Sequence, residues 1–174
     1  EFLNTLTYPL YFLDFETYSV TIPEFDGVRP YEKIPFQYSL HYIENDELQH
    51  KDFLAVPDKD PRRALAESLV NDIPKDVCIL AYNMSFEKTL IKKFALTYPD
   101  LKEHLFNIYY HIEDLMIPFK ERNYYTKEMY GSYSIKYVLP AIFKDDESLN
   151  YHNLDQIHNG SEAMNAYANM ENLD

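Results

Sequence analysis

Apolar and polar positions follow two different periods along the chain, and these predict both strands and helices. Short apolar or alternating runs bounded by turn residues predict strands, at 10–15, 36–43, 48–54, 77–81 and 108–112. Apolar residues at helical spacing predict helices, at 61–71, 86–96, 101–106, 135–143 and 161–170. Three strands in succession, followed by alternating helices and strands, predict an α/β fold with a mixed sheet. Its first three strands are expected to be antiparallel, the later ones parallel, and helices to flank the sheet.

Local signals place the ends of these elements. The polar residues 44–47 predict a hairpin turn between the second and third strands, and prolines and a glycine predict a loop over 19–35. Asp60 is the predicted N-cap of a helix that starts with Pro61, and Ser85 is the predicted N-cap of the next helix.

Two carboxylates stand one residue apart at the end of the first predicted strand. Side chains alternate between the faces of a strand, so Asp14 and Glu16 point the same way. Neighbouring carboxylates repel, and a divalent metal neutralises them best. The alternative is an incidental pair in an acidic protein, at a strand end that reaches solvent.

A second group of polar residues follows the apolar strand at 77–81. The corner between this strand and the next helix carries Asn83 and Glu87, and the carboxyl ends of strands are where open α/β sheets build their sites. The alternative is that Glu87 only complements the helix dipole in the first turn.

These residues resemble motifs of a known superfamily. Asp-x-Glu on a first strand, then Asn-x-x-Phe-acid at the start of a helix, is similar to the first two motifs of the DEDD 3′–5′ exonucleases. Two later segments also resemble elements of that superfamily. They are the strand-like segment 109–115, which ends near Asp114, and the helix start at 132–139. Longer motifs resemble one uncharacterised bacterial domain family within it, at 11–37, 82–89 and 131–136.

The resemblance implies a ribonuclease-H-like fold and metal-dependent hydrolysis of phosphodiesters at a single-stranded nucleic-acid end. Asp14, Glu16 and Glu87 would be the catalytic residues and would hold two divalent cations, Mg²⁺ or Mn²⁺. The same resemblance implies that substrate is bound by Thr17, Asn83 and Phe86, and that Asp114 is close to the site. A catalytically silent module that binds nucleic acid or a protein partner is the alternative.

Two departures from the superfamily pattern affect these expectations. Glu87 stands where the superfamily usually has Asp, and the last acid, on a late helix after a Tyr or His, has no clear counterpart. The segment 167–171 has the right spacing but ends in Glu171. We therefore expect residues 1–174 to be a single domain, truncated at its C-terminal end and excised from a longer protein that could carry a neighbouring nuclease domain. Weak or no activity is expected of this fragment.

Composition narrows the class of protein. The length of 174 residues with 46% hydrophobic residues suits one domain with its own core. The single cysteine, Cys78, lies within an apolar strand, so the chain has no disulfide framework. No apolar run is long enough to span a membrane. We therefore expect a cytoplasmic protein.

The net charge of −13 argues against broad nucleic-acid binding over the surface, although an acidic metal site is compatible with a nuclease. Four tyrosines in a polar stretch could stack on single-stranded bases or cover the edge of the core: Tyr124, Tyr125, Tyr130 and Tyr133.

Overall fold

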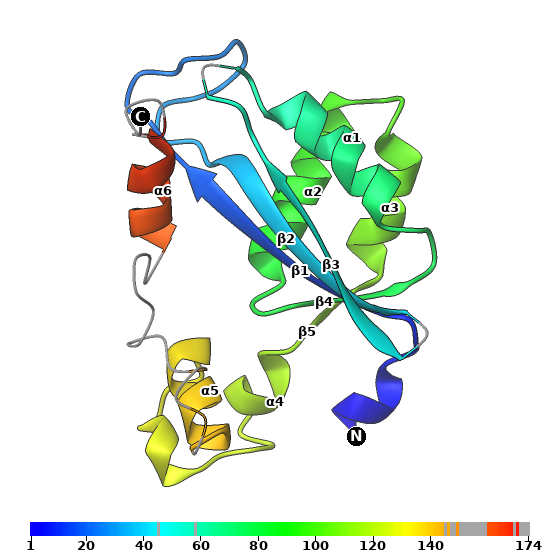
Figure 1. The fold of residues 1–174 in the computed structure, drawn as a ribbon, viewed down its shortest axis with the longest axis vertical. Helices are drawn as coiled ribbons and strands as arrows, with labels where there is room; N and C mark the ends of the chain where they lie inside the picture. The colour runs from blue at the N-terminus through cyan, green and yellow to red at the C-terminus, as the bar shows by residue number, and fades with distance from the viewer. Residues whose placement is uncertain are drawn as a thin grey trace.

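The computed structural model of the chain is a mixed five-stranded sheet with helices on both sides (Figure 1). The structure describes residues 1–44, 46–57, 59–144, 146, 149, 160–168 and 170. The predicted α/β class and the mixture of antiparallel and parallel strands are confirmed.

The sheet has the strand order β3-β2-β1-β4-β5. Its strands are β1 (Leu10–Tyr18), β2 (Ile34–Glu44), β3 (Glu47–Leu54), β4 (Cys78–Ala81) and β5 (Ile112–Asp114). Strands β1, β2 and β3 pair antiparallel, which confirms the predicted hairpin between β2 and β3. Strands β4 and β5 run parallel to β1, so the carboxyl ends of these three strands lie at the same edge of the sheet.

The helices form two groups. The first covers one face of the sheet and consists of α1 (Arg62–Asp72), α2 (Ser85–Thr97) and α3 (Lys102–Tyr110). The second lies on the opposite side in Figure 1 and consists of α4 (Ile117–Lys120), α5 (Ile135–Ile142) and α6 (Gly160–Ala168). Two short 3₁₀ helices, η1 (Phe2–Thr5) and η2 (Lys127–Met129), complete the described elements.

The main core lies between the sheet and the first group of helices. Alternation along β1 directs Tyr11, Leu13 and Phe15 into this core, where they pack with Leu69 of α1 and Ile91 of α2. The alternate residues of β1 therefore face away from α1, α2 and α3. A smaller cluster at the carboxyl end of β1 packs Tyr18 and Phe36 against Tyr167 of α6.

Three local predictions were wrong. The predicted strand at 108–112 is the end of α3, followed by a strand of only three residues, because Leu105 and Ile108 bury on one face of a helix. Ser85 does not cap α2; its hydroxyl donates to Asn83 Oδ1 over 2.8 Å. The helix predicted from Pro61 begins at Arg62, although Asp60 Oδ1 does accept the Arg62 backbone N–H over 3.1 Å.

A buried hydroxyl ties the hairpin to α1. The fully buried Tyr38 of β2 donates to Asp72 Oδ2 over 2.6 Å, and its oxygen lies 2.7 Å from Ser68 Oγ. The other oxygen of Asp72 accepts from Lys51 Nζ of β3 over 3.0 Å. Burial, with the hydrogen bond to Asp72, raises the pKa of Tyr38, so this hydroxyl remains a donor.

Tyr38→Phe should lower the free energy of unfolding by about 1–2 kcal/mol, because it leaves the Asp72 and Ser68 oxygens with one partner fewer. Urea denaturation followed by circular dichroism measures this. Tyr42→Phe is the matched control: it lies on the same strand, and the described residues provide no hydrogen-bond partner for its hydroxyl. An equal decrease in both variants would show that the Tyr38 hydroxyl adds no stability.

Candidate functional site

The candidate site begins on the face of the sheet that α1, α2 and α3 leave uncovered. Asp14 and Glu16 share this face with Phe12, as the alternation predicted, and the antiparallel register places Ser39 beside Asp14 and His41 beside Phe12. After Glu16 the register shifts at a β-bulge, and the half-buried Thr17 pairs with Pro35. The bulge interrupts the regular pairing of β1 directly after the two acids, a common feature next to functional sites.

The corner between β4 and α2 is held by the buried Asp114 of β5. Asp114 Oδ1 accepts the backbone N–H groups of Asn83 and Met116, each over 2.9 Å. Asn83 adopts φ 71°, a left-handed conformation that Asn tolerates better than most residues. Asp114 therefore fixes the turn that starts α2, a structural role that the sequence did not reveal.

Glu87, in the first turn of α2, has the most unfavourable environment of the ionisable groups in the site. The residue is 2% exposed, and its Oε2 has no hydrogen-bond partner among the described residues. Burial, together with repulsion from Asp14 and Asp114, raises the pKa of Glu87 to about 7. Phe86, the neighbouring residue, is half-buried against the main core, so it supports the helix start rather than lying open to substrate.

The two acids of β1 also carry raised pKa values. Enclosure by the surrounding protein raises the pKa of Asp14, although its side chain is open to solvent on one side. Burial and then repulsion from Asp14 raise the pKa of Glu16. Asp14 thus interacts with both Glu16 and Glu87, which links acids from two distant segments of the sequence. We call Asp14, Glu16, Glu87 and Asp114 the acid cluster.

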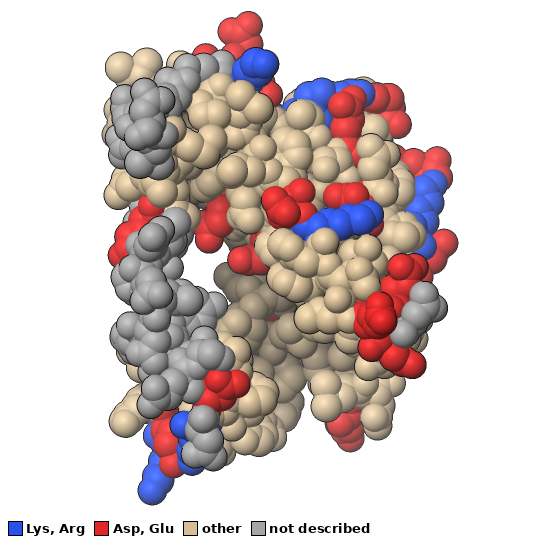
Figure 2. Space-filling model, viewed as in Figure 1, with Lys and Arg blue, Asp and Glu red and all other residues tan. Residues whose placement is uncertain are grey.

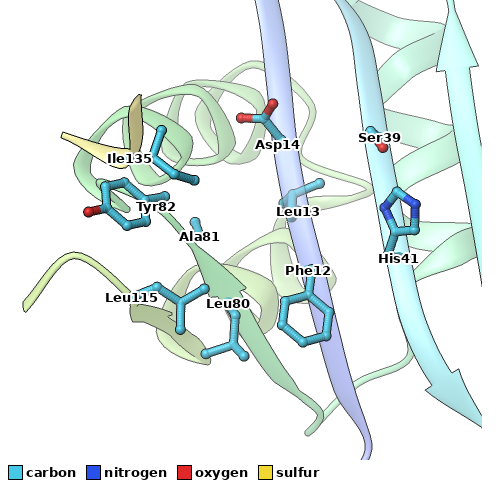
Figure 3. A pocket seen from close by; sticks show the side chains of 10 residues that line it. All are labelled: Phe12, Leu13, Asp14, Ser39, His41, Leu80, Ala81, Tyr82, Leu115 and Ile135. Carbon is cyan, nitrogen blue, oxygen red and sulfur yellow. The ribbon is translucent and has the colours of Figure 1, made fainter. Parts of the chain in front are cut away.

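A pocket of about 300 Å³ adjoins Asp14. Its walls come from the uncovered face of the sheet, from the corner after β4 and from the start of α5 (Figure 3). Phe12, Leu80 and Leu115 supply apolar surface, whereas Asp14 and His41 supply polar groups. Figure 2 shows a hollow in this side of the molecule, with Asp and Glu atoms on the sheet side of it.

Tyr82 closes one wall of this pocket. Its hydroxyl donates to the Tyr133 carbonyl oxygen over 2.5 Å, which connects the β4 corner to the segment before α5. Burial and repulsion from Asp114 raise the pKa of Tyr82 to about 12, so the group keeps its proton at neutral pH. The four tyrosines of the polar stretch, Tyr133 included, remain 45–81% exposed.

The described residues contain no group of three or more His, Cys, Asp or Glu side chains arranged to hold a metal ion. Among these described residues, the acids predicted to be ligands do not form a preformed cation site, and metal binding stays a prediction. Repulsion between unneutralised carboxylates opposes closer approach. Glu171, weighed as a fourth acid, lies outside the described residues.

The chain belongs to the DUF2779 family, described as a domain of unknown function, whose family model matches residues 11–134. This match covers the acid cluster and the pocket except for Ile135. No curated protein and no solved structure matches the chain. Within the described residues, no helix is long and apolar enough to cross a membrane.

The raised pKa of Glu87 predicts that the fold loses stability as pH rises. Between the ordinary value of 4.5 and about 7, the unfolded chain releases this proton while the folded chain keeps it. The free energy of unfolding should therefore fall across this window, by up to about 3 kcal/mol from Glu87 alone, and level off above it. Asp14 and Glu16, with raised pKa values, contribute in the same direction.

Glu87→Gln should remove most of this fall, as measured by urea denaturation between pH 5 and pH 8 without metal. Asp14→Asn removes one source of repulsion and should reduce the fall without abolishing it. An unchanged fall in Glu87→Gln would show that Glu87 ionises normally in the folded protein.

Proposed function

We propose that this chain is a metal-dependent 3′–5′ exonuclease-like domain that hydrolyses nucleic-acid phosphodiesters. Asp14, Glu16 and Glu87 would be the metal ligands and catalytic residues. The observation that carries the proposal is the buried Glu87 carboxylate, with one oxygen unpartnered among the described residues and with Asp14 close enough to repel it. A charge held in that position destabilises the fold and is retained where it has a chemical use.

The donor set suits a hard divalent cation. Asp14, Glu16 and Glu87 offer carboxylate oxygens, the ligands that Mg²⁺ and Mn²⁺ prefer. A cation would neutralise the repulsion that raises their pKa values and would give Glu87 Oε2 a partner. Two such cations would supply activation of water and neutralisation of charge on the phosphate.

The remaining residues of the site position the acids. The Asp114 side chain holds the backbone of the β4 corner, and through it the start of α2 that carries Glu87. The Asn83 side-chain oxygen accepts from Ser85, so its exposed amide nitrogen is the atom available to a substrate. Tyr82 stays protonated, which makes it a hydrogen-bond donor and not the base that receives a proton from water.

The topology supports the ribonuclease-H-like part of the proposal. Three antiparallel strands are followed by two parallel strands joined through helices, as that resemblance implies. The acid cluster lies at the carboxyl ends of the parallel strands, where open α/β sheets bind ligands. A reducing, cytoplasmic setting is part of the proposal, since the one cysteine is buried and free.

A catalytically silent module that binds nucleic acid is the second candidate. It is favoured by the lack, among the described residues, of any three-ligand metal group. The pocket beside Asp14 would then be a binding site without hydrolysis.

Manganese should allow the chain to shorten a 5′-labelled single-stranded oligonucleotide from its 3′ end. We expect slow turnover, because the last acid of the superfamily pattern has no clear counterpart and the acid cluster offers three candidate ligands. Its fourth member, Asp114, already accepts two backbone N–H groups. Glu16→Gln should reduce the rate roughly 100-fold or more, since even indirect support of a metal ligand is worth up to that factor. Denaturing gels resolve the shortened products one nucleotide at a time.

A thermal-shift measurement separates the two candidates. Manganese at about 100 times its Kd should raise the Tm by roughly 5–10 °C, and Asp14→Asn should abolish the rise. A rise without shortening would favour the silent module. An equal rise in Asp14→Asn would place the metal elsewhere and contradict the proposed site.

A further inference from the structure

A second cleft lies between the loop after β1 and helix α2. Its volume is about 610 Å³, and it is lined by Gly27, Arg29, Pro30, Tyr31, Glu32, Lys33, Thr89, Leu90 and Lys93. Three of these side chains are cationic, those of Arg29, Lys33 and Lys93, and one, that of Glu32, is a carboxylate. The whole chain, in contrast, has a net charge of −13. Anions that the rest of the surface repels would find an attractive field here.

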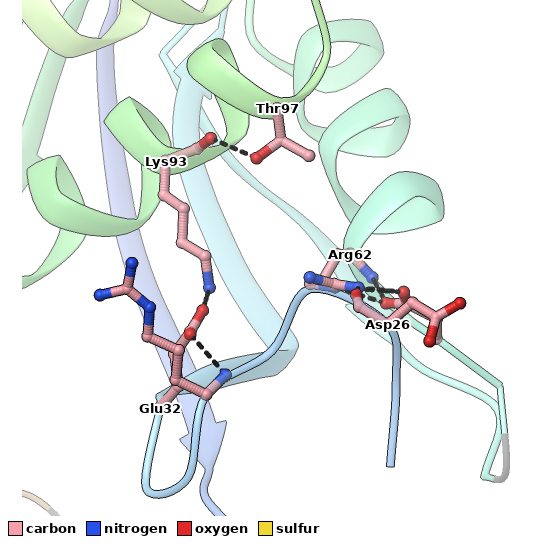
Figure 4. Close-up of polar contacts among 7 residues, drawn as sticks. Asp26, Glu32, Arg62, Lys93 and Thr97 are labelled. Atoms are coloured by element: carbon pink, nitrogen blue, oxygen red, sulfur yellow. Dashed lines mark hydrogen bonds and ion pairs between the residues drawn. The ribbon is translucent and has the colours of Figure 1, made fainter. Parts of the chain in front are cut away.

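The single carboxylate of this cleft is already used to hold the loop. Lys93 Nζ donates to Glu32 Oε1, while Glu32 Oε2 accepts the Arg29 backbone N–H over 2.9 Å (Figure 4). Lys93 and Glu32 therefore brace the loop against α2. The exposed side chains of Arg29 and Lys33 form no ion pair or hydrogen bond with the described residues, so both remain available to a ligand.

Tyr31 presents an aromatic ring in this cleft from a strained backbone. The residue is 69% exposed and has φ 59°, a left-handed conformation that is unusual for a bulky side chain. The hydrogen bond from Tyr31 N to the Val20 carbonyl, 2.9 Å long, and the braced Glu32 next to it hold it there. Backbone strain of this kind persists at ligand clamps, where the surroundings enforce it.

Both walls of the cleft belong to segments that also carry members of the acid cluster. One wall is α2, on which Leu90 and Lys93 follow Glu87 by three and six residues, so that Lys93 lies about 9 Å along the axis. The other wall is the loop that follows β1. In this loop the Tyr31 backbone N–H donates to the carbonyl oxygen of Val20, and Val20 lies four residues after Glu16. A chain of phosphates with one end at the acid cluster could continue into this cleft.

We propose that this cleft binds single-stranded nucleic acid, with Arg29 and Lys33 on successive phosphates and a base stacked on Tyr31. Basic grooves with an exposed aromatic ring suit a single strand, because they contact the backbone and the base faces together. The assignment of this ligand class rests on the proposed nuclease function, whereas the binding itself needs neither metal nor hydrolysis.

The test is fluorescence anisotropy of a labelled oligothymidylate of about twelve nucleotides, at low salt and in EDTA, so that no strand is cut. Tyr31→Asn should weaken binding roughly ten-fold while leaving the Tm unchanged or higher, because Asn tolerates the left-handed conformation. Tyr31→Phe keeps the ring and should bind like the wild type.

The salt dependence of binding tests the proposed phosphate contacts of Arg29 and Lys33. The slope of log K against log salt should become shallower by about 0.7 for each phosphate that the protein no longer neutralises, hence by about 1.4 when Arg29 and Lys33 are both changed to Ala. Lys102→Ala is the matched control, since this exposed lysine at the start of α3 is outside the cleft. An equal effect of Lys102→Ala, or normal binding by Tyr31→Asn, would overturn the proposal.

Two further outcomes separate the cleft from the nuclease activity. In the first, substitutions of Tyr31, Arg29 and Lys33 weaken binding, but the oligonucleotide is not shortened in manganese. This result would support the cleft and contradict the nuclease activity. Shortening that depends on Glu16 but is indifferent to all three cleft residues would support the activity and overturn the cleft. Competition by polyglutamate as strong as that by the oligonucleotide would also overturn it, since the cleft would then select only negative charge.

Discussion

The candidate site is organised around a carboxylate buried where three chain segments meet. Glu87 is placed by the first turn of α2, Asp14 by the alternation of β1, and Asp114 by the parallel pairing of β5 with β4. Because Glu87 is desolvated and repelled by both acids, its pKa rises to about 7. A core that needed only to be stable would place an apolar residue here, so the arrangement favours a chemical use for the charge.

The elements around this carboxylate are fixed by ordinary packing and hydrogen bonding. The Tyr38 hydroxyl joins β2 to α1, and Asp114 joins the end of β5 to the β4 corner. Lys93 of α2 donates to Glu32, and Arg62 of α1 donates to the Asp26 carbonyl oxygen over 2.8 Å (Figure 4). These two contacts hold the segment after β1 against α2 and α1, and the cleft beside α2 brings three cations together in an acidic chain.

Strong hydrophobic periodicity made most of this fold predictable, and side-chain alternation placed Asp14 and Glu16 on one face correctly. The segment 108–112 was predicted wrongly because Ile108, Tyr109 and Tyr110 favour strands by composition, whereas burial of Leu105 and Ile108 decides for a helix. The structural role of Asp114 and the cleft at Tyr31 depend on contacts between distant segments. Their signals, a buried acid at the end of a short strand and an aromatic residue at a positive φ, become visible only in three dimensions.

The proposed function requires that Asp14 and Glu87 share a divalent cation. Anomalous scattering from crystals soaked in manganese chloride, recorded near the manganese absorption edge, tests it most directly. We expect a peak within about 2.0–2.6 Å of carboxylate oxygens of both residues. Fully occupied manganese elsewhere on the molecule, with no peak between Asp14 and Glu87, would contradict it.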